Sequence, residues 1–220
     1  MRALFPLAVA LAAVPARADR DLDFRLFDAA REGKAASVVG LLQQGAAVDA
    51  RNRLGNTPLN LAAQGSHTDT VRLLLAHGAD PNKPNLRNAT PLMGAAFIGA
   101  LDVARVLLET GATVEASDNT QKTAMIYAAG NGHTQIVALL LDRGVDVNRR
   151  YHNDLTALMW AAGYGRTETV RLLLERGANP ELRDNRGKTA LTMALENGHA
   201  EAAKVLEKPE AANPLSRPTQ

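Results

Sequence analysis

A single spacing of 33 residues runs through most of this 220-residue chain. Three residue types share it, and each keeps its own phase. The threonines are Thr57, Thr90, Thr123, Thr156 and Thr189, the alanines are Ala29, Ala62, Ala95, Ala128, Ala161 and Ala194, and the glycines are Gly45, Gly78, Gly111, Gly144 and Gly177. Three independent sets with one period indicate repeated units that bury their apolar faces by stacking on one another.

Each unit carries the signals of two helices. Thr57 and its equivalents offer a side-chain oxygen to the free amides of a helix start, and Pro58 fits the first turn because a missing amide costs nothing there. Paired alanines keep this helix thin. The second helix carries leucines on more than one of its faces. A helix that packs against its partner helix and against two neighbouring repeats requires this. The glycine then ends it through a left-handed turn.

Three stretches carry a resemblance to a known family: NTPLNLAAQGSHTDTVRLLLAHGADPN, KTAMIYAAGNGHTQIVALLLDRGVDVN and LTALMWAAGYGRTETVRLLLERGANPE. They resemble ankyrin repeats, and the resemblance covers residues 22 to about 208. It implies an all-α ankyrin-repeat solenoid of about six 33-residue repeats, each a helix–turn–helix with a hairpin loop. Within a domain of residues 19–208, the expected repeats are 22–51, 52–84, 85–117, 118–150, 151–183 and 184–208.

The outer repeats depart from the pattern as the ends of a stack should. Repeat one lacks the threonine–proline start, and we expect Phe24 and Phe27 to pack beneath its first helix. That helix also carries charged residues, namely Arg25, Asp28, Arg31, Glu32 and Lys34. Repeat six replaces the leucine run with AEAAKVLEK, and polar end units of this kind protect a stack from water. Residues 209–220 contain prolines without periodicity, which predicts a disordered tail.

The first eighteen residues, MRALFPLAVALAAVPARA, have the order of a secretory signal peptide. Arg2 is followed by an apolar run up to Val14 and by small residues at Ala16 and Ala18, so we expect cleavage after Ala18. The alternative is an amphipathic helix that belongs to the fold. Because the apolar run is too short to span a bilayer, the mature protein is expected in the periplasm or the medium, without a membrane anchor.

Charge and cysteine content limit the partners and the chemistry. Removing Arg2 and Arg17 takes the 25 basic residues to 23, which the 23 acidic residues balance. Nucleic acid is therefore not an expected partner, because binding it needs clustered positive charge. The absence of cysteine excludes disulfides, thiolate metal ligands and a cysteine nucleophile. It also suits an oxidising compartment, where a stray thiol would mispair.

The sequence contains no recognisable catalytic or metal-binding constellation. Three of the five histidines, His67, His133 and His199, share one repeat position at the turn between helices, where we expect them to satisfy turn carbonyls. Equivalent copies lie too far apart to share a metal ion. No HExxH helix, glycine-rich phosphate loop or GxSxG motif occurs. We therefore expect a protein that is not an enzyme and that needs no metal or cofactor.

The resemblance to ankyrin repeats places partner contacts at the hairpin tips and on the inner helices. The tip residues vary while their flanks obey the repeat, as expected of an interaction surface and equally of a solvated loop. The basic tips would suit an acidic rim around an apolar target. The candidate tip residues are Arg53, Leu54, Arg87, Lys122, His152, Asn153, Arg186 and Lys188.

Aromatic residues gather in repeats three to five. Phe97 and Ile98 of repeat three and Tyr164 of repeat five occupy positions that usually face outward on the inner side. The other candidates are Tyr127, Tyr151 and Trp160. We place the centre of binding here because aromatic anchors dominate the energetics of interfaces. For Tyr127 and Trp160, a role as oversized core residues is an equal alternative.

Together these patterns predict an exported, monomeric and non-enzymatic scaffold that binds another protein through its concave face and hairpin tips. The chain resembles small periplasmic ankyrin proteins of Gram-negative bacteria, which implies support of a periplasmic antioxidant enzyme such as catalase. One alternative is a secreted effector or enzyme inhibitor that uses the hairpin tips. Another is small-molecule binding between the inner helices near Trp160.

Overall fold

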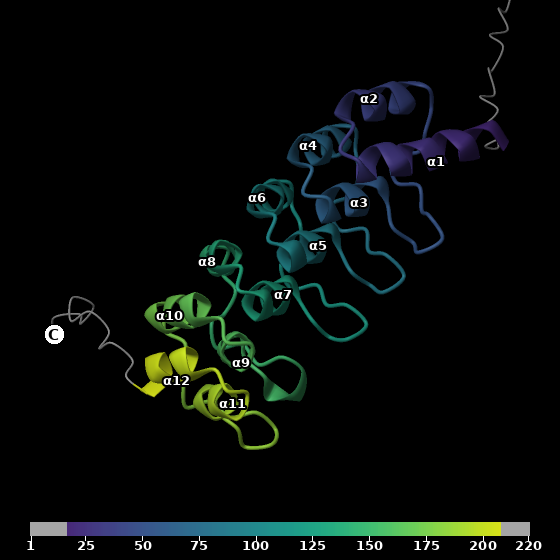
Figure 1. The fold of residues 1–220 in the computed structure, drawn as a ribbon. Coiled ribbons are helices and arrows are strands. Elements are labelled where there is room, and N and C mark those ends of the chain that lie inside the picture. The colour runs from purple at the N-terminus through teal and green to yellow at the C-terminus, as the bar shows by residue number, and fades with distance from the viewer. Residues whose placement is uncertain (1–16, 208–220) are drawn as a thin grey trace, which may run out of the picture.

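The computed structural model describes residues 17–207, which form a stack of paired helices (Figure 1). The inner column consists of α1 (Arg17–Arg31), α3 (Pro58–Gln64), α5 (Pro91–Ile98), α7 (Ala124–Asn131), α9 (Ala157–Gly163) and α11 (Ala190–Glu196). The outer column consists of α2 (Ala35–Gln43), α4 (Thr68–Ala76), α6 (Leu101–Glu109), α8 (Thr134–Asp142), α10 (Thr167–Glu175) and α12 (Ala200–Glu207). Residues 17–207 contain no strand, so the predicted all-α solenoid is confirmed.

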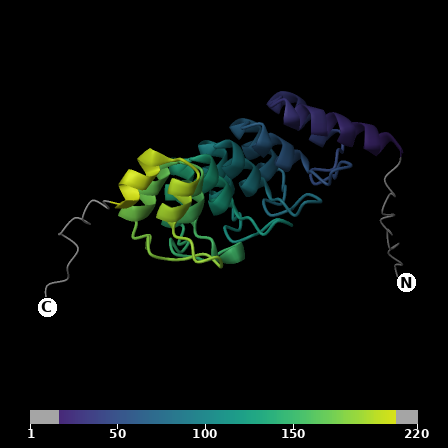
Figure 2. The same ribbon diagram turned by 60° about the horizontal axis from the view of Figure 1, so that its bottom comes forward.

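Hairpin loops join consecutive pairs and project from the inner side of the stack (Figure 2). One of them contains a short 3-10 turn, η1 (His152–Asp154). No helix within residues 17–207 has the length and apolar character needed to cross a membrane. The predicted leader, apart from its last two residues, and the predicted disordered tail lie outside the described residues.

The core runs without interruption along the stack. Ala62, Ala95, Ala128 and Ala161 of the inner helices have no exposed surface, and small side chains at these positions let neighbouring inner helices pack closely. The outer helices contribute fully buried leucines to the same core, among them Leu107. Each helix pair therefore hides its apolar faces against the pairs before and after it.

The predicted helix signals are largely confirmed. Four of the repeated threonines cap their helices, because each accepts a hydrogen bond from the backbone amide three residues further on: Thr57, Thr90, Thr156 and Thr189. Thr123 is buried but makes no capping bond at the start of α7. The repeated glycines that end the outer helices have φ between +87° and +99°, as in Gly111 at +91°. This left-handed conformation explains the glycine at that position.

A repeated Asn or Asp shapes most of the hairpins. The side-chain oxygens of Asn52, Asn85, Asp118 and Asp184 each accept backbone amides two and four residues further on. Repeat five has Tyr151 at this position, and its hairpin instead forms η1, with Asn153 and Asp154 at φ of 61° and 60°. Neighbouring tips are joined by backbone bonds, such as the 3.1 Å bond from the Leu86 amide to the Leu54 carbonyl.

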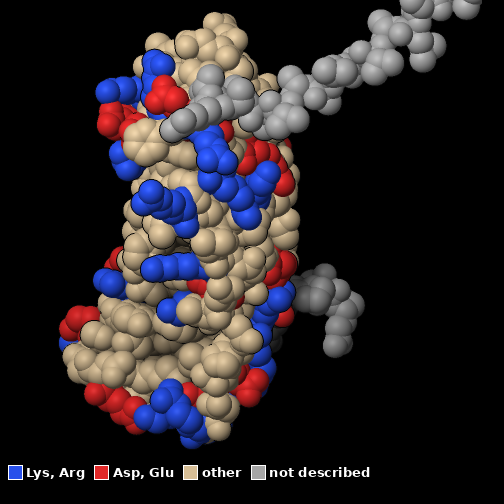
Figure 3. Space-filling view, turned by 90° about the vertical axis from the view of Figure 1, so that its right-hand side faces the viewer, with Lys and Arg blue, Asp and Glu red and all other residues tan. Residues whose placement is uncertain are grey.

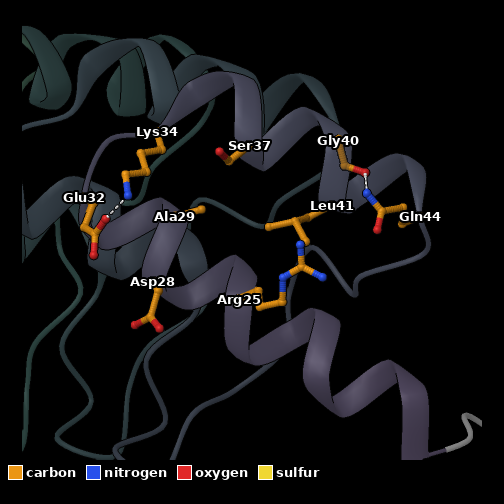
Figure 4. A pocket seen from close by; sticks show the side chains of 9 residues that line it. All are labelled: Arg25, Asp28, Ala29, Glu32, Lys34, Ser37, Gly40, Leu41 and Gln44. Carbon is orange, nitrogen blue, oxygen red and sulfur yellow. Dashed lines mark hydrogen bonds and ion pairs between the residues drawn. The ribbon is translucent and has the colours of Figure 1, made fainter.

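Repeat one forms a polar end. Figure 4 shows its outer surface, a hollow of about 370 Å³ between α1 and α2 that is lined mainly by charged and polar groups. Glu32 pairs with Lys34 at 2.6 Å, and the Gln44 amide donates to the Gly40 carbonyl at 2.9 Å. These contacts support the expected role of repeat one as a cap.

The expected packing of Phe24 beneath the first helix is wrong. Its side chain is 63% exposed, whereas Phe27 is partly buried. The reason is the length of α1, which begins at Arg17, well before Arg25, the position equivalent to the first residue of α3. The added turns extend past the second repeat on the hairpin side (Figure 1), and Phe24 belongs to this extension, where no neighbouring helix covers it.

Candidate functional site

Four aromatic side chains from three repeats form a line on the inner side, which we call the aromatic row: Phe97, Tyr127, Trp160 and Tyr164. Phe97 in α5 meets Tyr127 in α7 edge to face, with ring centroids 5.6 Å apart and an interplanar angle of 88°. Trp160 and Tyr164, both from the α9 region, stack with centroids 5.7 Å apart and planes 7° apart. Both arrangements are favourable for aromatic rings.

Lys122 joins the two aromatic pairs. It lies in the hairpin before α7, and its Nζ is 5.7 Å from the centroid of the Tyr127 ring and 5.2 Å from that of the Trp160 ring. Among the described residues, no carboxylate lies within 4.0 Å of this ammonium group. Its contacts with the two rings are therefore cation–π interactions. Lys122 was expected at a hairpin tip, but its side chain lies over the aromatic row.

The row has an exposed part and a packed part. Phe97 is 56% and Tyr164 is 53% exposed, and the neighbouring Ile98 is 39% exposed. Tyr127 and Trp160 are partly buried against the core. Tyr127 and Trp160 thus pack partly against the core, as the alternative of a core role expects. Each also contacts one of the exposed rings, Tyr127 that of Phe97 and Trp160 that of Tyr164.

A glycine makes room for the stacked pair. Gly130 of α7 is buried, and a Cβ at its position would lie 3.5 Å from the Trp160 ring and 3.8 Å from the Tyr164 ring. A larger side chain there would displace both rings. At these distances a Cβ makes ordinary van der Waals contact, so alanine would fit, and only a longer side chain would move the Trp160–Tyr164 pair.

The hairpin of repeat four is tied to the row through Tyr127 and Asp118. The Tyr127 hydroxyl donates to the Asp118 carboxylate. Burial, followed by this bond, raises the pKa of Tyr127 to about 12. Burial alone would raise the pKa of Asp118, but the hydroxyls of Tyr127 and Thr120 donate to its carboxylate and hold that pKa below its ordinary value. At neutral pH the Asp118 carboxylate is thus charged, the Tyr127 hydroxyl is neutral, and the hydrogen bond between them holds the Tyr127 ring in place.

A family model described as "Ankyrin repeats (3 copies)" matches residues 26–118, 78–151 and 148–216. The chain belongs to the ankyrin-repeat family. The crystal structure of the human ASB11 ankyrin repeat domain is similar to this array, with a TM-score of 0.78 and 29% sequence identity over 87% of this chain and 85% of that chain. No curated protein matches the sequence significantly. Membership of this family indicates a protein-binding scaffold.

The remaining candidate aromatic of the ankyrin array lies away from the row. Tyr151 is partly buried in the hairpin of repeat five, and the Arg149 guanidinium lies 5.6 Å from its ring centroid. Burial raises the pKa of the Tyr151 hydroxyl to about 12. His152 and Asn153 follow it in η1 with exposed side chains. Tyr151 packs against the core and, among the described residues, makes no ring–ring contact with the aromatic row, so it is not a member of it.

The basic tips of the ankyrin array fall into two groups. Arg186 pairs with Asp184 at 2.8 Å, and Lys188 pairs with Glu196, so the charges of these two tips are compensated. Arg53 and Arg87 are exposed, and no carboxylate of the described residues lies within 4.0 Å of them. Together with Lys122, the tips without a carboxylate partner among the described residues thus belong to repeats two to four.

The predicted role of the repeated histidines is confirmed for two of them. His67 Nε2 lies 2.9 Å from the Arg31 carbonyl oxygen, and His133 Nε2 lies 3.0 Å from that of Phe97. Each imidazole thus links its repeat to the preceding one. Within residues 17–207, no three histidine or carboxylate side chains are grouped as metal ligands.

Two features of the inner side were not predicted from the sequence. The first is the hairpin-forming Asn or Asp, which a search five residues before each repeated threonine would have found. The second is a hollow beside Phe24, whose exposure depends on how far α1 extends. The sequence gave no clear signal that the first helix begins at Arg17, before the expected start of repeat one at residue 22.

Proposed function

We propose that this ankyrin array is an exported, monomeric scaffold without catalytic activity, and that it binds another protein through the aromatic row and the adjoining hairpin tips. The observation that carries the proposal is the pair of exposed rings, Phe97 and Tyr164, held in place by Tyr127, Trp160 and Lys122. Rings that are already ordered lose little conformational entropy on binding. More of the free energy gained by burying them therefore contributes to affinity.

Two finer parts of the proposal rest on the sequence. Export is supported by the leader pattern of residues 1–18 and by the absence of cysteine. Support of a periplasmic antioxidant enzyme such as catalase rests on resemblance alone, and it names a first partner to test in the binding experiment below.

The test is recovery of the partner from a periplasmic extract with the tagged native protein and with a Phe97→Ala, Tyr164→Ala double variant. Removing two aromatic anchors is expected to reduce the recovered partner at least about tenfold. Both side chains are more than half exposed, so the variant should stay folded and lose only about 1–3 kcal/mol of unfolding free energy, from its two aromatic pairs.

The matched control is Leu195→Ala, which removes another exposed apolar side chain, this one 56% exposed on α11. It should leave recovery unchanged. Full recovery with the double variant, or equal losses with the double variant and the control, would show that the aromatic row is not the docking surface.

A further inference from the structure

A second hollow lies at the N-terminal end of the inner side. It has a volume of about 960 Å³ and is formed by α1 and the hairpin that leads to α3. We call it the N-terminal pocket. Its apolar lining comes from Phe24, Phe27, Leu54 and Leu61. None of these residues belongs to the aromatic row.

The apolar lining is unusually open to solvent. Leu54 is 67% exposed, and Phe24 is 63% exposed although it belongs to the end repeat, where a cap is expected to be polar. Large apolar side chains that stand together in a hollow and remain exposed mark a binding surface. An apolar group placed between Phe24 and Leu54 would remove this surface from water.

The rim of the N-terminal pocket is basic. Four arginines and two aspartates line it: Arg20, Arg31, Arg51, Arg53, Asp23 and Asp28. Both aspartates are already engaged, because Asp28 pairs with Arg31 and the Asp23 carboxylate accepts the Ala47 amide at 2.8 Å. Arg51 donates to the Pro84 carbonyl. Figure 3 shows the side of the molecule that carries the hairpins, where Lys and Arg side chains lie over the N-terminal part with Asp and Glu beside them, and again further along the stack.

Among the described side chains, Arg20 and Arg53 are the rim arginines without a contact to a carboxylate or a carbonyl group. No carboxylate of the described side chains lies within 4.0 Å of either guanidinium group. A guanidinium group can donate two parallel hydrogen bonds to one carboxylate, which makes carboxylates its best-matched protein partners. The basic rim of the N-terminal pocket thus favours anionic groups on a ligand, while its apolar lining favours an apolar group on the same ligand.

We propose that the N-terminal pocket binds a segment of a partner protein in which acidic residues flank a large apolar side chain. The apolar side chain lies against Phe24 and Leu54, and the flanking carboxylates accept hydrogen bonds from Arg20 and Arg53. Nucleic acid is disfavoured because two available arginines are too few for a run of phosphate contacts. The proposal does not depend on the aromatic row, since the two surfaces share no residue.

The test uses the full chain and fluorescein-labelled peptides, with binding followed by fluorescence anisotropy at low salt. The probe EEFEELEE combines acidic and apolar residues, KKFKKLKK reverses its charge, and EEGEEGEE removes its apolar side chains. EEFEELEE is expected to bind most tightly, and Arg53→Glu and Leu54→Ser are each expected to weaken it about fivefold. Raising the salt concentration should weaken binding as well.

Each variant has a matched control on the same chain. Arg105→Glu reverses an exposed arginine on α6, and Leu195→Ser replaces an exposed leucine on α11; both should leave binding unchanged. Any of four results would overturn the proposal: no binding of EEFEELEE, equal binding of KKFKKLKK, equal binding of EEGEEGEE, or equal loss in variants and controls. Tighter binding of an oligothymidine octamer, lost with Arg53→Glu, would assign the pocket to nucleic acid instead.

Discussion

Replacing Leu107 with alanine is expected to lower the free energy of unfolding by about 3–5 kcal/mol. Leu107 lies in α6 with no exposed surface, and α4, α5 and α8 all pack against α6. A cavity enclosed by stacked helices cannot close without moving a neighbouring repeat. Because stability in a repeat array includes the interfaces between neighbours, the loss should extend beyond repeat three.

Denaturant unfolding followed by circular dichroism measures this effect. Leu86→Ala is the matched control, because Leu86 is a leucine of the same repeat that is 67% exposed at the hairpin tip. We expect the control to change the free energy of unfolding by at most about 0.5–1 kcal/mol. Similar losses in the two variants would mean that the α6 side of the stack does not form the tight core described above.

The second large effect is expected for Gly99→Ala at the end of α5. Gly99 has φ +83°, and an added Cβ would lie 2.5 Å from His133 Nδ1. The variant should lose about 1–2 kcal/mol through left-handed strain and about 1 kcal/mol more as His133 moves and its bond to the Phe97 carbonyl breaks. A total of about 2–3 kcal/mol is therefore expected in thermal or denaturant unfolding.

Gly78→Ala separates these two causes. Gly78 has φ +87°, but an added Cβ there would have no atom within 4 Å. It should therefore lose only the conformational part, about 1–2 kcal/mol. If Gly78→Ala is as destabilising as Gly99→Ala, the contact between His133 and the preceding repeat contributes nothing to the stack.

The architecture was predictable because its determinants are local and repeated. A capping threonine, a thin alanine pair and a left-handed glycine each act within a few residues, so their spacing was enough to predict the helices. Thr123 shows the limit, because it keeps the residue type without the capping bond. Tyr151 shows another, since it stands where the other repeats have the hairpin-forming Asn or Asp, and its hairpin forms a 3-10 turn instead.

The geometry of the candidate surfaces was only partly predictable. The clustering of aromatics in repeats three to five could be read from the sequence, and Phe97 and Tyr164 are exposed as expected. The contacts of Lys122 could not, because they depend on how two neighbouring repeats place Tyr127 and Trp160 around one side chain. The N-terminal pocket depends on the length of α1, which extends beyond any repeat pattern.

The central claim, that a partner protein covers the aromatic row, is tested most directly by hydroxyl-radical footprinting of the native complex against the free protein. Phe97 and Tyr164 expose more than half of their side chains in the free protein and should be labelled readily. In the complex we expect their labelling to fall several-fold, while the exposed Leu195 keeps its rate. Unchanged labelling of both rings in the bound state would contradict the account.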